Sequence, residues 1–217
     1  MIPLRDETRR PLGFAWVTAT FIAVNAVVFF LELAKGDAFV AQWAATPADI
    51  AANHRLFTLV SSMFMHASWS HIIGNMIFLW AFGPQIEDAM GPLRYGLFYF
   101  AGGIAAMLAQ VAADPSSTVP SLGASGAIAA VMGAFLITYP RDRIRTILFF
   151  GFFARVTFIP AVVLIGFWLV TQLVSLGAVS GPQPSGVAYM AHLGGAVFGA
   201  LTARLFEHRR PQDQMLI

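Results

Sequence analysis

Four polar residues in apolar stretches of this chain are of types that could carry out nucleophilic catalysis. Ser125 lies in the segment SLGASGAIAA, between glycines and just before a long uncharged run, so its hydroxyl is expected where a helix begins. His71, Asn75 and His192 lie in two other apolar stretches. A hydroxyl beside an imidazole is a nucleophile with its general base. This chemistry requires elements that bring these side chains together.

The composition places this chain among membrane proteins. Its 217 residues are 58% hydrophobic and only 11% charged, which is outside the range of ordinary soluble domains. There is no cysteine, so a disulfide framework and a thiolate metal site are both excluded. The arginines are scattered over several loops without interleaved aromatic residues, which disfavours a nucleic-acid partner.

Several uncharged or nearly uncharged runs approach or exceed the length of about 20 residues that a bilayer-spanning helix needs. A Gly-, Pro- and Ser-rich segment, GAVSGPQPSG, divides the last long run into two. The chain is thus predicted to be an all-α membrane protein, with residues 1–217 forming a single membrane domain of six transmembrane helices. The expected spans are about 13–33, 70–88, 94–113, 123–139, 157–176 and 187–206.

The positive charges predict the orientation of the chain. With six spans both termini share one side, and that side carries eleven of the 13 Lys and Arg residues. Cytoplasmic loops are rich in Lys and Arg, so the short tails 1–12 and 207–217 are expected in the cytoplasm. Only Lys35 and Arg55 fall on the other side, in a long first loop from Lys35 to Trp69. This loop is expected to contain short amphipathic helices in the membrane interface, as either a structural cap or a substrate-facing element.

The four polar residues are predicted to lie at similar depths in the membrane. At 1.5 Å per residue, Ser125 is roughly 21 Å from the inner end of its span, and His192 and Asn75 are each roughly 18 Å from theirs. His71, one turn before Asn75, is at roughly 24 Å and shares its helix face. All four thus fall in the outer half of a hydrocarbon core about 30 Å thick. Polar side chains at that depth normally face the protein interior or a wet cavity, where they find partners.

These residues could form a Ser/His dyad with an oxyanion hole. Ser125 is expected at a helix N-terminus, where unpaired N–H groups point toward developing negative charge. His71 and Asn75 could add side-chain donors. No Asp or Glu is expected at this level, so the arrangement is a dyad and not a triad. Glycines flank the site on both helices, and Gly195 with Gly199 forms a GxxxG pattern that permits close helix packing.

Three motifs together resemble a known family. GASG at 123–126, HASWSHIIGN at 66–75 and AHLGG at 191–195, on the fourth, second and sixth expected spans, are similar to motifs of rhomboid intramembrane serine proteases of the bacterial six-span type. The resemblance implies that Ser125 is the nucleophile and His192 its base. It also implies an oxyanion hole made by His71, Asn75 and the Ser125 amide.

The resemblance further implies the partners and location of the protein. The expected substrates are single-span membrane proteins, cut near the outer membrane face, with no metal or other cofactor. The expected location is the bacterial inner membrane. His66 and Arg55 match residues that stabilise the first loop in the family. The chain departs from the family at Ala129, where many members carry an aromatic residue that packs on the catalytic histidine, and at His54, where a tryptophan is common.

Other functions are less well supported. A catalytically inactive relative that binds membrane helices would have the same fold, although such proteins lose the serine or the histidine. A transporter would need polar groups that continue to the other side, whereas the inner halves of these spans are almost wholly apolar. A zinc protease would need a motif such as HExxH, which the sequence lacks.

Overall fold

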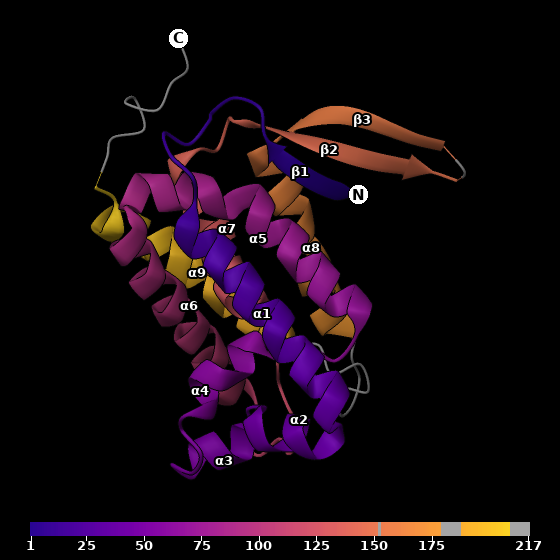
Figure 1. Cartoon of the computed structure of the whole chain (residues 1–217), viewed down its shortest axis with the longest axis vertical. Coiled ribbons are helices and arrows are strands. Elements are labelled where there is room, and N and C mark those ends of the chain that lie inside the picture. The colour runs from indigo at the N-terminus through magenta and orange to yellow at the C-terminus, as the bar shows by residue number, and fades with distance from the viewer. Residues whose placement is uncertain (152, 179–187, 209–217) are drawn as a thin grey trace.

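The computed structural model describes residues 1–151, 153–178 and 188–208. It is a bundle of long helices with a small sheet at one end and several short helices at the other (Figure 1). Most of the GAVSGPQPSG segment and residues 209–217 of the expected C-terminal tail lie outside this part of the chain. The long helices are α1 (Trp16–Lys35), α5 (Trp69–Met90), α6 (Pro92–Ala113), α7 (Ser125–Thr138), α8 (Ala161–Ala178) and α9 (Tyr189–Phe206).

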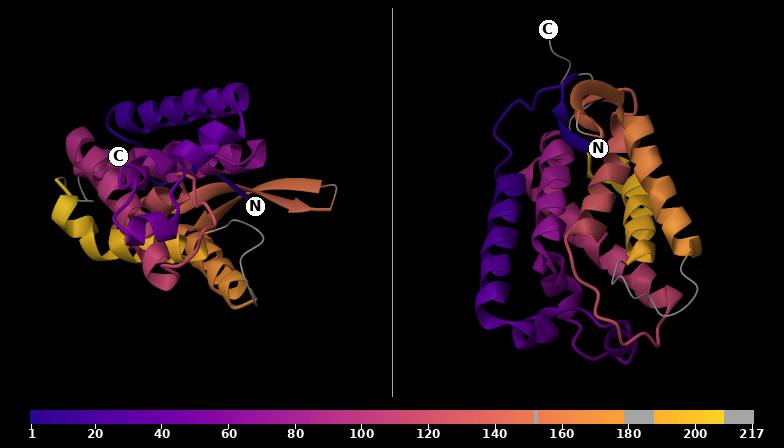
Figure 2. Two further views of the ribbon diagram at one scale, coloured as in Figure 1. Left: turned by 90° about the horizontal axis from the view of Figure 1, so that it is seen from below. Right: turned by 90° about the vertical axis from the view of Figure 1, so that its right-hand side faces the viewer.

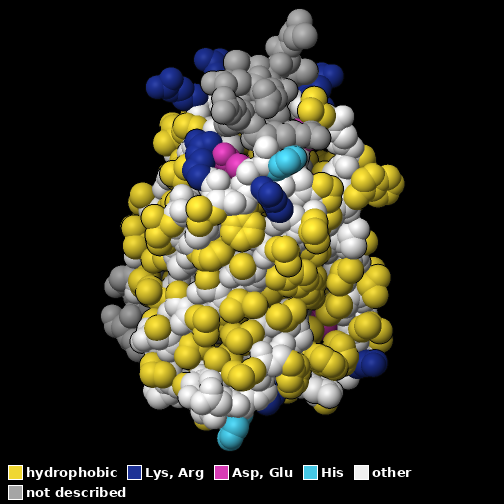
Figure 3. Space-filling view, turned by 90° about the vertical axis from the view of Figure 1, so that its left-hand side faces the viewer, with side chains coloured by type: hydrophobic (Ala, Val, Ile, Leu, Met, Phe, Trp, Pro, Cys, Tyr) yellow, Lys and Arg dark blue, Asp and Glu magenta, His cyan; other side chains and the backbone are white. Residues whose placement is uncertain are grey.

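Helix α7 lies at the centre of the bundle. Nearly all of its residues from Gly126 to Phe135 are buried, and α5, α6, α8 and α9 pack around it. Within the described residues, two helices, α1 and α6, are long and apolar enough to cross a bilayer by themselves, while α7 and the Ala161–Leu176 part of α8 are apolar but shorter. On the face shown in Figure 3, hydrophobic side chains cover the middle of the molecule, and Lys and Arg gather toward its ends.

Glycine allows α7 and α9 to touch through their backbones. A Cβ at Gly199 of α9 would stand only 1.9 Å from the carbonyl oxygen of Ala130, and one at Gly133 of α7 would stand 2.1 Å from the carbonyl oxygen of Ala196. Contacts this close exclude any side chain, as expected where small residues bring two membrane helices together. This packing fixes the start of α7 beside the first turns of α9.

A three-stranded antiparallel sheet corrects the all-α expectation. Strands β1 (Ile2–Asp6), β2 (Arg143–Phe150) and β3 (Phe153–Pro160) pair in the order β1-β2-β3. The segment was expected to be a short charged loop followed by a span from residue 157. Its alternating β-branched and aromatic residues instead favour strands, and Gly151, at φ +60°, supplies the tight turn between β2 and β3.

The sheet lies at the same end of the bundle as the last turn of α9 (Figure 2). An ion pair between Arg9 and Asp142 holds the N-terminal tail at this end of the bundle. Glu87, near the end of α5, accepts hydrogen bonds from the N–H groups of Val17 and Thr18 and so caps the start of α1. Most of the arginines in the described chain therefore share one end of the molecule.

The first loop forms short helices at the opposite end. These are α2 (Asp37–Trp43), α3 (Pro47–Ala51), α4 (Thr58–Ser61) and a 3₁₀ turn, Ser62–Phe64. Arg55 holds them together by donating to the carbonyl oxygens of Ala41 and Gln42 and to the Asp49 carboxylate. Glu32 at the end of α1 accepts the N–H of His66 through both carboxylate oxygens. The loop is thus anchored to α1 just before α5 begins.

Candidate active site

A cavity of about 530 Å³ lies between α5, α7, α8 and α9, at the end of the bundle next to the first loop. All four polar residues singled out by the sequence line it, whereas its inner wall is apolar. Among the lining residues that the structure describes, none is acidic. The polar side chains are Ser68, Ser70, His71, Asn75, Ser125 and His192, and the larger apolar ones are Phe78, Leu122, Ile128, Met132 and Trp168.

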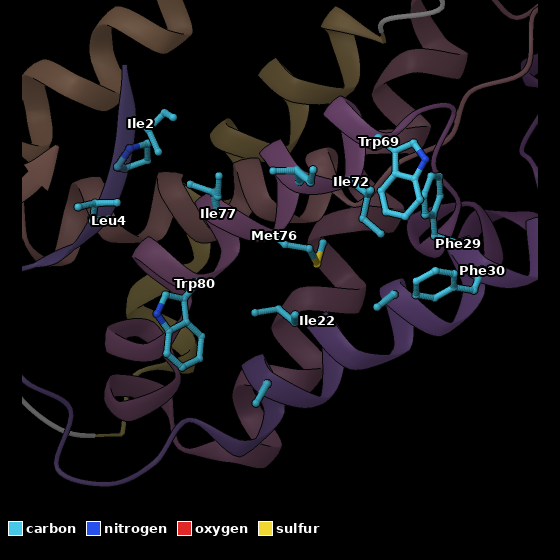
Figure 4. Close-up of a pocket in the computed structure, with 14 residues that line it drawn as sticks. Ile2, Leu4, Ile22, Phe29, Phe30, Trp69, Ile72, Met76, Ile77 and Trp80 are labelled. Atoms are coloured by element: carbon cyan, nitrogen blue, oxygen red, sulfur yellow. The ribbon is translucent and has the colours of Figure 1, made fainter. Parts of the chain in front are cut away.

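A second and larger cavity, of about 620 Å³, lies between α1 and α5 next to β1 (Figure 4). Apolar side chains line it throughout, from Trp69 at one end to Trp80 at the other. None of the described residues that line it is a nucleophile or a general base. The residues that could carry out catalysis line the smaller, polar cavity.

Ser125 and His192 are in direct contact. The Ser125 hydroxyl oxygen lies 2.7 Å from Nε2 of His192, a normal length for a hydrogen bond from a hydroxyl. His192 lies on the first turn of α9 and is 92% buried, with an exposed fraction of 8%. This is the geometry in which an imidazole can accept the proton of a serine nucleophile.

The backbone before Ser125 is held in a conformation that suits glycine. Gly123 has φ +128°, and a Cβ there would stand 2.8 Å from Nε2 of His71 and 3.5 Å from the hydroxyl oxygen of Ser125. Its N–H donates to the carbonyl oxygen of Ser62 at 2.9 Å, which ties the segment to the first loop. Ser125 then begins α7, whose first-turn N–H groups have no acceptor within the helix. His71 and the Ser125 hydroxyl thus border the same small space.

Asn75 contacts a histidine of the first loop. Its Nδ2 lies 2.9 Å from Nε2 of His66, which is almost wholly buried. Because an amide nitrogen only donates, His66 accepts here, and the second N–H of the Asn75 amide remains available to the cavity. The ring of His66 also packs edge-on against that of His71 at 5.0 Å. His66 therefore supports both residues expected to bind an oxyanion.

Two residues of α8 that sequence reasoning missed hold the ring of His192. Oε1 of Gln172 lies 2.7 Å from Nδ1 of His192, and the Trp168 ring lies 5.4 Å from the imidazole, centre to centre. Gln172 and Trp168 thus make the contacts with the His192 ring for which the buried side chain of Ala129 is too small. A glutamine within an otherwise apolar run was the available signal, since a polar group in such a run normally has a partner.

Comparison with known proteins identifies relatives of this chain. The Rhomboid domain family model matches residues 53–209. RHOMBOID-like protein 12, mitochondrial, of Arabidopsis thaliana is 32% identical over 202 residues, which cover 85% of this chain and 56% of that protein. Rhomboid protease GluP of Bacillus subtilis is 31% identical over 137 residues, which cover 60% of this chain and 26% of that one. The Putative rhomboid protease YdcA of the same organism is 28% identical over 136 residues, or 61% and 68% of the two chains.

The chain spans about half the length of the plant relative and a quarter of that of GluP. The family match nevertheless covers well over half of the chain and includes all four candidate site residues. Together with the apolar helices, this match confirms the family resemblance that the three motifs indicated. The chain belongs to the rhomboid family and is an integral membrane protein.

Proposed function

We propose that this protein is an intramembrane serine endopeptidase that cleaves transmembrane segments near the outer membrane face. The observation that carries this proposal is the 2.7 Å contact between the Ser125 hydroxyl and Nε2 of His192 inside a polar cavity. The family includes proteins named as proteases. In this proposal Ser125 and His192 form a catalytic dyad.

The reaction follows from the geometry of the dyad. As the Ser125 oxygen bonds to the substrate carbonyl carbon, its proton moves to Nε2 of His192. His192 then gives that proton to the leaving amine as the C–N bond breaks, which leaves an acyl-enzyme on Ser125. A water molecule, deprotonated by the same imidazole, attacks the acyl-enzyme. As the bond between the acyl carbon and the Ser125 oxygen breaks, His192 returns that proton to Ser125 and the carboxylic acid product leaves.

The negative charge that develops on the carbonyl oxygen needs donors near Ser125. The first-turn N–H groups of α7, the imidazole of His71 and the free N–H of the Asn75 amide border the cavity at this point. Donors fixed in place before the reaction stabilise an oxyanion strongly because they need no reorganisation. His71 and Asn75 are therefore assigned to the oxyanion hole.

We also propose a bacterial-type six-span arrangement with both termini in the cytoplasm, and the distribution of arginine supports this orientation. The arginine-rich sheet and the end of α9 share one end of the bundle, and the cavity opens near the other. Arginine marks the cytoplasmic side of membrane proteins. The cavity then lies toward the outer face of an inner membrane, where it would receive single-span membrane proteins.

The experiment is proteolysis of a single-span test substrate by the purified protein in liposomes. Wild type should cleave it, whereas Ser125→Ala and His192→Ala should each lose cleavage. The double variant should be no worse than either, since residues that act as one unit are strongly non-additive. Equal cutting by wild type and Ser125→Ala would refute the proposal. Substrate binding without cleavage by wild type would favour a catalytically inactive rhomboid-like protein that binds membrane helices.

A further inference from the structure

A continuous series of hydrogen bonds links the backbone of α8 to Ser125. The hydroxyl of Thr171 donates to the carbonyl oxygen of Trp168 at 2.6 Å. Nε2 of Gln172 lies 3.1 Å from the Thr171 hydroxyl oxygen and 3.3 Å from the same carbonyl oxygen. Oε1 of Gln172 lies 2.7 Å from Nδ1 of His192, whose Nε2 meets Ser125. Every link is of hydrogen-bond length.

The neighbours of Gln172 determine which way its amide faces. The Trp168 carbonyl can only accept, and the Thr171 hydroxyl, having donated its one proton to that carbonyl, also accepts. Both acceptors lie on the Nε2 side of the amide, so the NH₂ group belongs there and the carbonyl oxygen faces His192. The reversed amide would place its oxygen against the Trp168 carbonyl oxygen, which can only accept, and Thr171 could donate to that amide oxygen only by giving up its own bond to the same carbonyl.

This orientation selects one tautomer of His192. Because Oε1 accepts, Nδ1 must carry the proton, and Nε2 is left with a lone pair directed at the Ser125 hydroxyl. That is the tautomer in which the imidazole can act as the general base toward serine. The alternative tautomer, with the proton on Nε2, would donate to the serine oxygen and could not take its proton.

We propose that Gln172 is a positioning residue that holds His192 in the orientation and tautomer needed for catalysis. This inference rests on the proposed function of the Ser125 and His192 pair. Gln172 is itself buried, and Trp168, one turn earlier on α8, packs against the same imidazole. The site thus depends on α8 for a contact that the small Ala129 of α7 does not provide. His192 keeps this orientation and tautomer only while α8 packs against α9.

The test compares two substitutions of Gln172 with a matched control. Gln172→Leu keeps the approximate size but removes the acceptor, whereas Gln172→Glu keeps an oxygen toward Nδ1. Gln85→Leu, at a buried glutamine of α5 outside the cavity, controls for the loss of an amide from the bundle. We expect Gln172→Leu to lower kcat about 10- to 100-fold with KM nearly unchanged, because only the orientation of the base is lost.

The pH dependence separates positioning from simple packing. In Gln172→Glu, kcat should stay within a few-fold of wild type, and the acidic limb of its pH profile should shift to higher pH because the carboxylate stabilises the protonated imidazole. The Gln85→Leu control should keep the wild-type profile. A Gln172→Leu protein with wild-type kcat and pH profile would overturn the inference, as would a Gln172→Glu profile identical to that of wild type.

A second measurement does not need proteolysis. Histidine labelled with ¹⁵N in the Ser125→Ala protein should show His192 protonated at Nδ1, and adding Gln172→Leu should populate the other tautomer. Unchanged tautomer populations would contradict the role of Gln172 even if the wild type is a protease. If Gln172 sets the tautomer but the wild-type protein cleaves no substrate, the positioning role of Gln172 stands and the proposed function is refuted.

Discussion

Replacing Gly199 by alanine tests whether the contact between α7 and α9 positions the dyad. The added Cβ would stand 1.9 Å from the carbonyl oxygen of Ala130, where an ordinary contact is at least 3.4 Å. The helices must therefore separate by about 1.5 Å at this level, because a backbone carbonyl cannot rotate away as a flexible side chain can. Ser125 and His192 lie on these same two helices, so part of this displacement reaches their 2.7 Å contact.

The expected loss of activity follows from that displacement. A shift of about 1 Å would lengthen the contact between Ser125 and His192 beyond hydrogen-bond range, and a misplacement of this size costs roughly 100-fold in rate. Overpacking should also lower the free energy of unfolding by about 1 to 3 kcal/mol. Cleavage of a single-span substrate gives kcat, and thermal unfolding in detergent gives the stability.

Gly166→Ala is the matched control for this variant. Gly166 is also helical, on α8, but a Cβ there meets nothing within 4 Å. This control should retain wild-type kcat and stability. If Gly199→Ala also kept both, the backbone contact between α7 and α9 would not be the feature that holds the dyad together. An equal loss of kcat and stability in Gly199→Ala and Gly166→Ala would likewise contradict a specific role for this contact.

Three other predictions address the oxyanion hole, the sheet and the topology. Asn75→Ala should lower kcat roughly 10- to 1000-fold through the loss of one donor; unchanged turnover in a folded variant would assign Asn75 to packing. Burial, with the nearby Asp142 carboxylate, raises the pKa of Asp6 to about 7. The folded protein therefore binds more protons than the unfolded one between about pH 4 and pH 7, so its stability should fall as pH rises through that window. Asp6→Asn should flatten this decline in thermal unfolding between pH 5 and pH 8, and an equal decline in both proteins would contradict the assignment. A reporter fused after Ile217 should be cytoplasmic and one inserted near Ser117 external; an external C-terminus would contradict the proposed orientation.

The sequence could predict that the candidate site residues meet, because the rise per residue of a helix converts spacing along the sequence into depth in the membrane. Ser125 and His192 lie at similar distances from the ends of their helices, and glycine marks the faces along which α7 and α9 touch. The four residues line one cavity in the structure. What spacing alone did not reveal is that Asn75 already shares a hydrogen bond with His66.

The contribution of α8 could not be predicted in the same way. Which side of a nearly uniform apolar helix faces its neighbours depends on how the whole bundle packs, and the sequence of α8 carries almost no amphipathic pattern. Gln172 therefore has no partner that spacing alone would identify. The contact between Gln172 and His192 emerges only from the placement of α8 against α9.

The sheet was missed because its residues suggest two structures at once. The segment from Arg143 to Pro160 combines the arginines of a cytoplasmic loop with the apolar residues of a membrane span. Its β-branched and aromatic residues alternate in a way that favours strands. Pairing with β1, which comes from the N-terminal tail, completes the sheet. A partner more than 130 residues away in the sequence cannot be identified from local pattern.

Covalent labelling of the purified protein with a serine-directed fluorophosphonate, followed by mass spectrometry, tests most directly whether His192 activates Ser125. We expect a single modified serine, Ser125, and loss of its labelling in His192→Ala at unchanged thermal stability. Ser121, which lies four residues earlier and whose backbone pairs with that of Ala45, should remain unmodified. Labelling of Ser125 that is equally fast without His192, or no labelling at all in the folded wild type, would show that His192 does not activate Ser125.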